Sequence, residues 1–153
     1  MLRLAPRTRA DVAAWLETLP AEVRKEISAD WWAKFEASAF EDPWVHGFKL
    51  LLPDGTNVGT GSFKGPPVSG AVEIAYGIDP GHQGKGYATA AARLMVAFAF
   101  RSAGVSKVLA HTLPTGIASQ RVLLKAGFRK SGELVDPEDG LVWRFEADRA
   151  AVS

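Results

Sequence analysis

The residues best suited to bind a ligand form a glycine-rich loop, Gly81-His82-Gln83-Gly84-Lys85-Gly86-Tyr87-Ala88. Glycine lets the backbone adopt a positive φ and bring its N–H groups close to a ligand. A helix that begins in this loop adds unpaired N–H groups and the positive end of its dipole. The spacing therefore predicts an anion site suited to phosphate or pyrophosphate. A turn that only reverses the chain is the alternative.

Two common phosphate-binding motifs do not fit this loop. A P-loop requires Ser or Thr after its Gly-Lys pair, but Gly86 follows Lys85 here. The dinucleotide motif Gly-x-Gly-x-x-Gly requires a third glycine at the position of Thr89. Neither motif is present. A nucleotide-binding protein is still kept as an alternative, which a melting shift with ATP would indicate.

The loop is expected to join a strand to a helix. Residues 72–79 alternate apolar side chains with polar or small ones, which is the period-two pattern of a strand. Residues 86–103 are rich in alanine and predict a mostly buried helix that Gly104 ends.

The rest of the chain predicts further strands and helices around this unit. We expect strands at residues 2–5, 45–52, 58–64, 107–113, 128–135 and 141–146, and helices after Thr8 or Asp11, within 21–39 and at 117–126. Asp30 is the expected N-cap within the second helical stretch, and Gly127 the expected C-cap of the last helix. This order indicates an α/β (α+β) fold, a single domain over residues 1–153 with a mixed, mostly antiparallel central sheet flanked by helices.

Three segments resemble the signatures of one enzyme superfamily. Gln83-x-x-Gly86-x-Ala88 has its Gln/Arg-x-x-Gly-x-Gly/Ala pattern, and residues 72–80 resemble the strand that precedes that loop. Residues 118–128 resemble its second signature helix, which ends in Lys-x-Gly-Phe. In this order the segments resemble the GNAT N-acetyltransferase superfamily, in the branch that includes ribosomal-protein-alanine N-acetyltransferases.

The resemblance implies an enzyme that moves an acetyl group from acetyl-coenzyme A directly to a primary amine, on a small molecule or a protein N-terminus. The coenzyme would lie in a wedge where residues 76–78 separate from the strand at 107–113. A backbone N–H there would polarise the thioester carbonyl. The residues implied in coenzyme binding are Tyr76, Gly77, Ile78, Gln83, Gly84, Lys85, Gly86, Tyr87, Ala88 and Ser119.

Such a reaction requires a proton acceptor, because an amine with a pKa near 10.4 attacks only when it is deprotonated. Glu73 is the expected base, since it lies on the strand face opposite Val72 and Ile74, and the resemblance places carboxylates near this position. The alternative is a solvated charge. His111, on the strand that borders the wedge, could shuttle a proton, although a histidine satisfied at a strand edge is favoured.

Ser119 is the expected proton donor to the leaving thiolate, because Leu123 stands where many members of the superfamily carry tyrosine. The alternative for Ser119 is a hydroxyl that caps a helix. Gly116 and Ala90 likewise replace residues that are usually polar. These three departures motivate a second hypothesis, a coenzyme A-binding sensor or regulatory module without turnover.

Composition excludes several other classes. The 153 residues carry a net charge of +1, which argues against a nucleic-acid surface, and the absence of cysteine excludes disulfides and thiolate metal sites. The three histidines lack metal-ligand spacing, so no metal is expected. The longest apolar run, 94–100, is too short for a membrane span, and a cytoplasmic setting follows as the default. Oligomeric state is open, with a homodimer as one alternative.

Trp31 and Trp32 are predicted to belong to the core or to form an aromatic wall of the acceptor site, with the core favoured.

Overall fold

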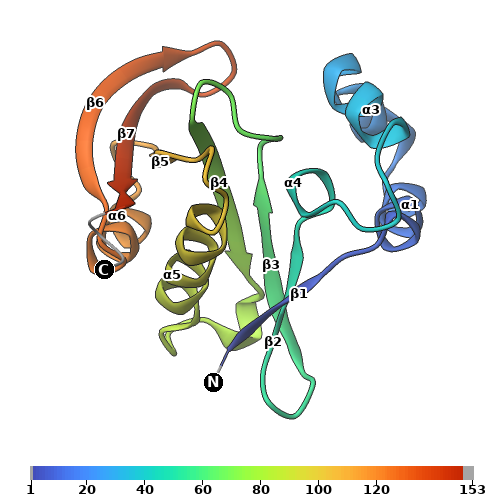
Figure 1. Ribbon diagram of the computed structural model, residues 1–153, viewed down its shortest axis with the longest axis horizontal. Helices are drawn as coiled ribbons and strands as arrows, with labels where there is room; N and C mark the ends of the chain where they lie inside the picture. Colours follow the sequence, from blue (N-terminus) through green and yellow to red (C-terminus); the bar gives the residue numbers. More distant parts are fainter. Residues whose placement is uncertain (1, 150–153) are drawn as a thin grey trace.

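The computed structural model describes residues 2–149, which form one seven-stranded sheet with helices packed against it (Figure 1). The strands are β1 (Arg3–Pro6), β2 (Phe48–Leu51), β3 (Asn57–Phe63), β4 (Ala71–Ile78), β5 (Lys107–Thr112), β6 (Arg129–Asp136) and β7 (Gly140–Asp148). The helices are α1 (Arg9–Thr18), α2 (Ala21–Lys25), α3 (Ala29–Glu36), α4 (Pro43–His46), α5 (Tyr87–Phe100) and α6 (Ile117–Lys125), with a 3₁₀ turn η1 at Pro80–His82.

The sheet is mixed, as the sequence predicts. Its strand order is β1-β2-β3-β4-β5-β7-β6. Within residues 2–149, the central pair of β4 with β5 is the only parallel one, and the five other pairs are antiparallel. The parallel pair requires a crossover, which α5 provides. The α/β fold with a mostly antiparallel sheet is therefore confirmed.

Helices α5 and α6 cover one face of this sheet. Figure 1 shows α5 lying across β4, with α6 beside the β6–β7 hairpin. Met95 and Val96 of α5 and Leu123 of α6 are fully buried against Val72 and Ile74 of β4. Alanines dominate α5, so the helix packs closely on the sheet while keeping high helix propensity. This packing fixes where the glycine-rich loop before α5 leaves the sheet.

The opposite face of the sheet carries polar side chains and is approached by α1. Thr8 caps α1 in a capping box with Asp11, whose side chain accepts the Thr8 N–H at 2.9 Å. Asp11 also lies 3.6 Å from Lys49 of β2. Helices α1 and α3 share a separate apolar cluster centred on Val12 and Phe35. They lie beyond the β1–β2–β3 side of the sheet in Figure 1.

Several expected boundaries are wrong, each for a local reason. The stretch 21–39 forms two helices, and Ser28 caps the second because its Oγ accepts the Trp31 N–H at 3.1 Å. Asp30, the expected cap, instead pairs with Lys34 in the first turns of α3.

Two further boundaries differ at glycines and at a proline. Pro43 begins the short helix α4, which takes Val45 out of the strand that starts at Phe48. Helix α5 ends at Phe100, before Gly104. The C-cap of α6 is Ala126, and Gly127 follows it with a φ of +96°.

None of the helices within residues 2–149 has the length and apolar character needed to cross a membrane.

Candidate functional site

The parallel strands β4 and β5 separate at the centre of the sheet. Their pairing ends at Glu73↔Leu109, although β4 continues to Ile78 and β5 to Thr112. Beyond Glu73, the β4 edge that faces β5 has no ladder partner among the described strands. Unpaired strand N–H and C=O groups can pair with an extended ligand. The wedge expected from the sequence is present.

The glycine-rich loop follows directly from the free end of β4. Gly84 and Gly86 have φ values of +78° and +82°, and a Cβ at either would meet no atom within 4 Å. Among the backbone hydrogen bonds of residues 2–149, none uses the amide of Gly84, Lys85 or Gly86 as donor. Gly86 is the N-cap of α5, so the N–H groups of its first turn face the same side. These amides are unpaired and have open space in front of them, which is the arrangement that an anion site requires.

The Gln83 side chain connects the loop to the strand. Its Nε2 donates to the carbonyl oxygen of Ile78 at 3.0 Å. Because this bond joins the first loop residues to the last residue of β4, it holds the loop against the strand end.

A cleft of about 560 Å³ connects the strand end, the loop and helix α6. Nine of the residues implied by the resemblance line it: Tyr76, Gly77, Ile78, Gln83, Gly84, Gly86, Tyr87, Ala88 and Ser119. Lys85 is exposed and does not line the cleft. Burial raises the pKa of Tyr76 to about 12, so its hydroxyl stays protonated at neutral pH.

The cleft has further lining residues that the sequence analysis did not select: His82, Thr89, Ala118, Val122 and Lys125. Thr89 lies one helical turn from Gly86, so helical spacing could have indicated it. Lys125 could not be found this way, because it reaches the cleft through the packing of α6 against α5. Its carbonyl accepts a 2.7 Å hydrogen bond from Arg93 of α5.

Glu73 lies at the point where β4 and β5 separate, on the face opposite the buried Val72 and Ile74. Its Oε2 is 2.8 Å from Lys64 Nζ and 3.0 Å from His111 Nδ1. The Glu73 and His111 side chains are 21% and 20% exposed, so the carboxylate is shielded but reachable. The structure thus joins two residues, Glu73 and His111, that the sequence treats separately.

The end of β5 beside this cluster carries unusual polar groups. His111 Nε2 and Thr112 Oγ1 are the buried side-chain atoms of the described residues that have no hydrogen-bond partner. These side chains point to opposite faces of β5: Thr112 lies with the buried Val108 and Ala110, and His111 lies on the face of Glu73. Buried polar groups are normally paired, so the unpaired His111 Nε2 suggests a place for water or substrate beside Glu73. The β6–β7 turn contributes a nearby carboxylate. Backbone amides of Asp139 and Glu138 lower the pKa of Asp136, and the charges of Lys64 and His111 lower it further.

Ser119 lies in the first turn of α6 and is exposed to the cleft. The N-cap of α6 is Gly116, and no side chain caps this helix. The capping role considered for Ser119 is therefore wrong. Leu123, one turn further on, is 1% exposed and packs in the main core, so its side chain contributes nothing to the cleft.

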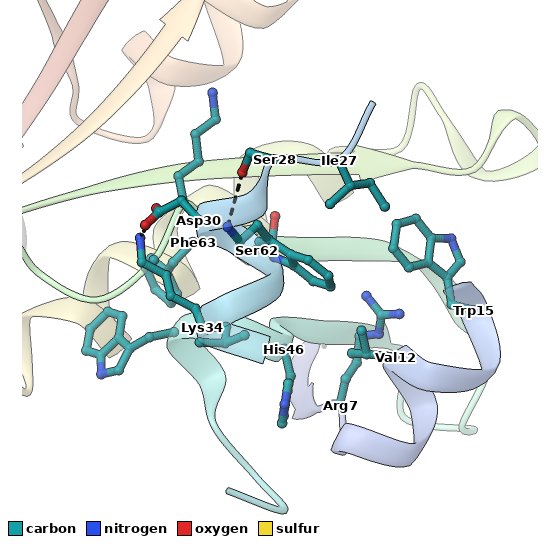
Figure 2. Close-up of a pocket in the computed structure, with 15 residues that line it drawn as sticks. Arg7, Val12, Trp15, Ile27, Ser28, Asp30, Lys34, His46, Ser62 and Phe63 are labelled. Carbon is teal, nitrogen blue, oxygen red and sulfur yellow. Dashed lines mark hydrogen bonds and ion pairs between the residues drawn. The ribbon is translucent and has the colours of Figure 1, made fainter. Parts of the chain in front are cut away.

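A second pocket of about 450 Å³ lies on the other side of β3, between α1, α3 and the end of that strand (Figure 2). Its charged lining residues are Arg7, Asp30, Lys34 and Lys64. Three tryptophans, Trp15, Trp31 and Trp44, add apolar walls. Trp31 is thus both part of the α1–α3 cluster and a wall of the pocket, whereas Trp32 belongs to the cluster alone. Lys64 joins this pocket to Glu73.

A family match agrees with this arrangement. Residues 2–129 match the family described as an acetyltransferase (GNAT) domain. The chain belongs to the GNAT family. The strand separation, the glycine loop and the α6 signature thus all lie in a GNAT domain, as the resemblance implies.

Individual GNAT relatives match shorter segments. The chain is 44% identical over 59 residues, 39% of its length, to "Probable N-acetyltransferase YjcK" of Bacillus subtilis and covers 33% of that protein. It is 30% identical over 96 residues, 63% of its length, to "FsC-acetyl coenzyme A-N(2)-transacetylase" of Aspergillus fumigatus and covers 37% of it. The matched segments therefore span about a third of these curated relatives.

Solved structures of other GNAT proteins share the fold over nearly the whole chain. Aminoglycoside acetyltransferase AAC(6')-Ib with coenzyme A and kanamycin gives a TM-score of 0.70 at 22% identity, covering 99% of this chain and 96% of that one. Spermidine N-acetyltransferase from Vibrio cholerae with CoA and spermine gives 0.73 at 16% identity, covering 99% and 97%. At such identities the likeness concerns the fold.

Proposed function

We propose that this chain, as one domain over residues 1–153, is an acetyl-CoA-dependent N-acetyltransferase that transfers an acetyl group directly to a primary amine. The observation that carries the proposal is the cleft in which the unpaired edge of β4 meets the free amides of Gly84 and Gly86. A pyrophosphate fits the amides, and an extended pantetheine amide chain fits the strand edge. GNAT membership supports both assignments.

The coenzyme would supply the acetyl group as a thioester, and residues of this chain would accept and donate the protons. Glu73 is suited to accept a proton from the ammonium group of the acceptor and leave a neutral amine, because Lys64 and His111 hold its carboxylate at the strand separation. The amine nitrogen then bonds to the acetyl carbon as the carbon–sulfur bond breaks, and the nitrogen releases its second proton to solvent. Ser119 is the candidate that gives a proton to the departing thiolate from the cleft wall, and it regains a proton from the same solvent.

The acceptor is proposed to be a small molecule. Two solved relatives of similar fold act on such amines, an aminoglycoside acetyltransferase and a spermidine N-acetyltransferase. The pocket on the Lys64 side of Glu73 has a matching size, about 450 Å³. The ribosomal-protein-alanine branch, a protein N-terminus as acceptor, a homodimer and a cytoplasmic location remain predictions from the sequence.

The direct test measures coenzyme binding and turnover separately. Calorimetry with coenzyme A and with ATP should show binding of the first only. Thiol release from acetyl-CoA with a panel of small amines should then show turnover. Glu73→Gln should lower kcat by about 100-fold or more with an unchanged coenzyme Kd, because a general base contributes that much.

Glu133→Gln is a matched control for this variant. Glu133 pairs with Lys130 at 3.0 Å on β6, much as Glu73 pairs with Lys64, but it lies outside both pockets. Its kcat should stay within twofold of the wild type. Equal kcat values for Glu73→Gln and the wild type would remove Glu73 from the reaction.

A coenzyme A-binding sensor is the second candidate, and the burial of Leu123 favours it, because no hydroxyl reaches the cleft from that position. The two functions give opposite results in the same assays. Coenzyme binding in calorimetry without thiol release on any amine would favour the sensor. Thiol release that depends on Glu73 would exclude it.

A further inference from the structure

The strongest unassigned feature is the guanidinium of Arg7 in the pocket between α1 and α3. Arg7 follows β1 and donates its backbone N–H to Gly47. The guanidinium carbon is 5.8 Å from the ring centroid of Trp15, and Figure 2 shows the two side chains together on the α1 side of the pocket. Burial lowers the pKa of Arg7, so the ion has lost part of its hydration there, although it stays charged.

Arg7 has no ion-pair partner among residues 2–149, in contrast to the two lysines of the pocket. Lys34 pairs with Asp30 at 2.9 Å, and Lys64 pairs with Glu73 at 2.8 Å. The acidic group that attracts Arg7 is Asp11.

Asp11 is already engaged elsewhere. Its carboxylate accepts the Thr8 N–H and lies 3.6 Å from Lys49. A partly buried guanidinium without a carboxylate is energetically unfavourable unless a ligand supplies one. The pocket thus has one positive charge in excess.

The position of Arg7 relative to Glu73 limits the shape of that ligand. Gly47, the backbone partner of Arg7, lies against Ser62 of β3, and Ser62 pairs with Ala75 of β4. Arg7 and β4 are therefore three strand spacings apart, about 14 Å between backbones. A molecule that places an amine at Glu73 and an anion at Arg7 must carry the two groups at opposite ends.

We propose that this pocket selects an acceptor amine that carries a carboxylate at its far end, separated from the amine by an apolar body, and that Arg7 binds the carboxylate. The inference rests on the proposed acetyltransferase function. Trp15, Trp31 and Trp44 contact the apolar body, and Lys64, which pairs with Glu73 at 2.8 Å, lies at the amine end. An acceptor with a second amine instead of the carboxylate meets an uncompensated positive charge and is disfavoured.

The test compares three amines of one size: 4-(aminomethyl)benzoate, 4-methylbenzylamine and para-xylylenediamine, which end in a carboxylate, a methyl group and an ammonium group. For the wild type, kcat/KM should be highest for the benzoate and lowest for the diamine. Arg7→Gln should lower kcat/KM for the benzoate by about 10- to 100-fold and leave 4-methylbenzylamine within twofold. Arg7→Lys keeps the charge and should retain part of the preference.

Arg3→Gln is the matched control, because Arg3 is exposed on β1, outside the pocket, and should behave as the wild type. A wild type that prefers the diamine or the neutral amine overturns the inference. So does an unchanged preference in Arg7→Gln. Turnover of any of the amines keeps the acetyltransferase function in either case.

A binding measurement separates the two proposals if no amine is acetylated. Trp15 and Trp31 line the pocket, so titration with 4-(aminomethyl)benzoate should quench tryptophan fluorescence. Quenching that Arg7→Gln abolishes supports the anion site, even where the acetyltransferase function has failed. No quenching of the wild type at millimolar ligand overturns the anion site.

Discussion

The conformation of Gly86 offers a sharp test of the proposed pyrophosphate site. Its φ of +82° lies in the left-handed region, and it lines the cleft at the N-terminus of α5. Gly86→Ala has two outcomes for the backbone. If alanine keeps this φ, its Cβ enters open space in the cleft. If it relaxes to a negative φ, the loop amides turn away from the ligand.

Either outcome should weaken coenzyme binding by at least the loss of one hydrogen bond to the pyrophosphate. Loss of one hydrogen bond to a charged group corresponds to about 1.5–3 kcal/mol, which is roughly 10- to 100-fold in Kd. The left-handed conformation also destabilises an alanine by about 1–2 kcal/mol. Gly86→Ala should therefore bind coenzyme A at least tenfold more weakly and unfold at lower urea concentration than the wild type.

Gly55→Ala separates the two effects. Gly55 has a φ of +89° in the turn between β2 and β3, and a Cβ there also meets nothing within 4 Å. Both variants should lose similar stability in urea titrations, but only Gly86→Ala should bind coenzyme A more weakly by calorimetry. Equal Kd values for the two variants would refute the assignment of the loop amides to the pyrophosphate.

Three further predictions concern catalysis, packing and pH. Ser119→Ala should lower kcat by about 10- to 100-fold with little change in coenzyme Kd. An unchanged kcat would mean that solvent, and not Ser119, protonates the departing thiolate. Leu123→Ala should destabilise the fold by about 2–5 kcal/mol in urea, whereas Leu124→Ala, at a site 57% exposed, should change it by under about 0.5 kcal/mol. Burial lowers the pKa of His46, whose Nδ1 accepts the Asp42 N–H at 3.2 Å. The unfolded chain thus binds the proton first as pH falls. The free energy of unfolding is therefore not reduced by His46 above about pH 6.5, and it falls in more acidic solution. The total loss is about 1.4 kcal/mol for each unit by which the pKa in the folded state lies below that in the unfolded state. His46→Gln should flatten that decline in urea titrations between pH 7 and 5, and equal slopes for both proteins would contradict it.

The sequence by itself determined the central unit of this protein. Alternation through residues 72–79 and the glycines at 84 and 86 encode a strand, a phosphate-type loop and a helix, because these signals depend on local conformation alone. Local chemistry also named Thr8 and Asp11 as the two candidates for the first cap, and the structure makes Thr8 the cap. Asp30 was chosen wrongly as a cap because Ser28, two residues earlier, offers an equivalent oxygen, and local chemistry does not choose between them.

Only the tertiary structure decided which side chains act together. Glu73 and His111 are 38 positions apart in the chain and meet because β4 pairs with β5 up to Glu73 and then separates. The Arg7 guanidinium lies 5.8 Å from the centroid of the Trp15 ring, and Gly47, its backbone partner, lies against Ser62 of β3, which pairs with β4. These contacts depend on how separate strands align, which no single segment encodes. Pairing between distant strands depends on the whole packed core, so the local sequence specified the glycine-rich loop, while the fold specified which residues line the two pockets.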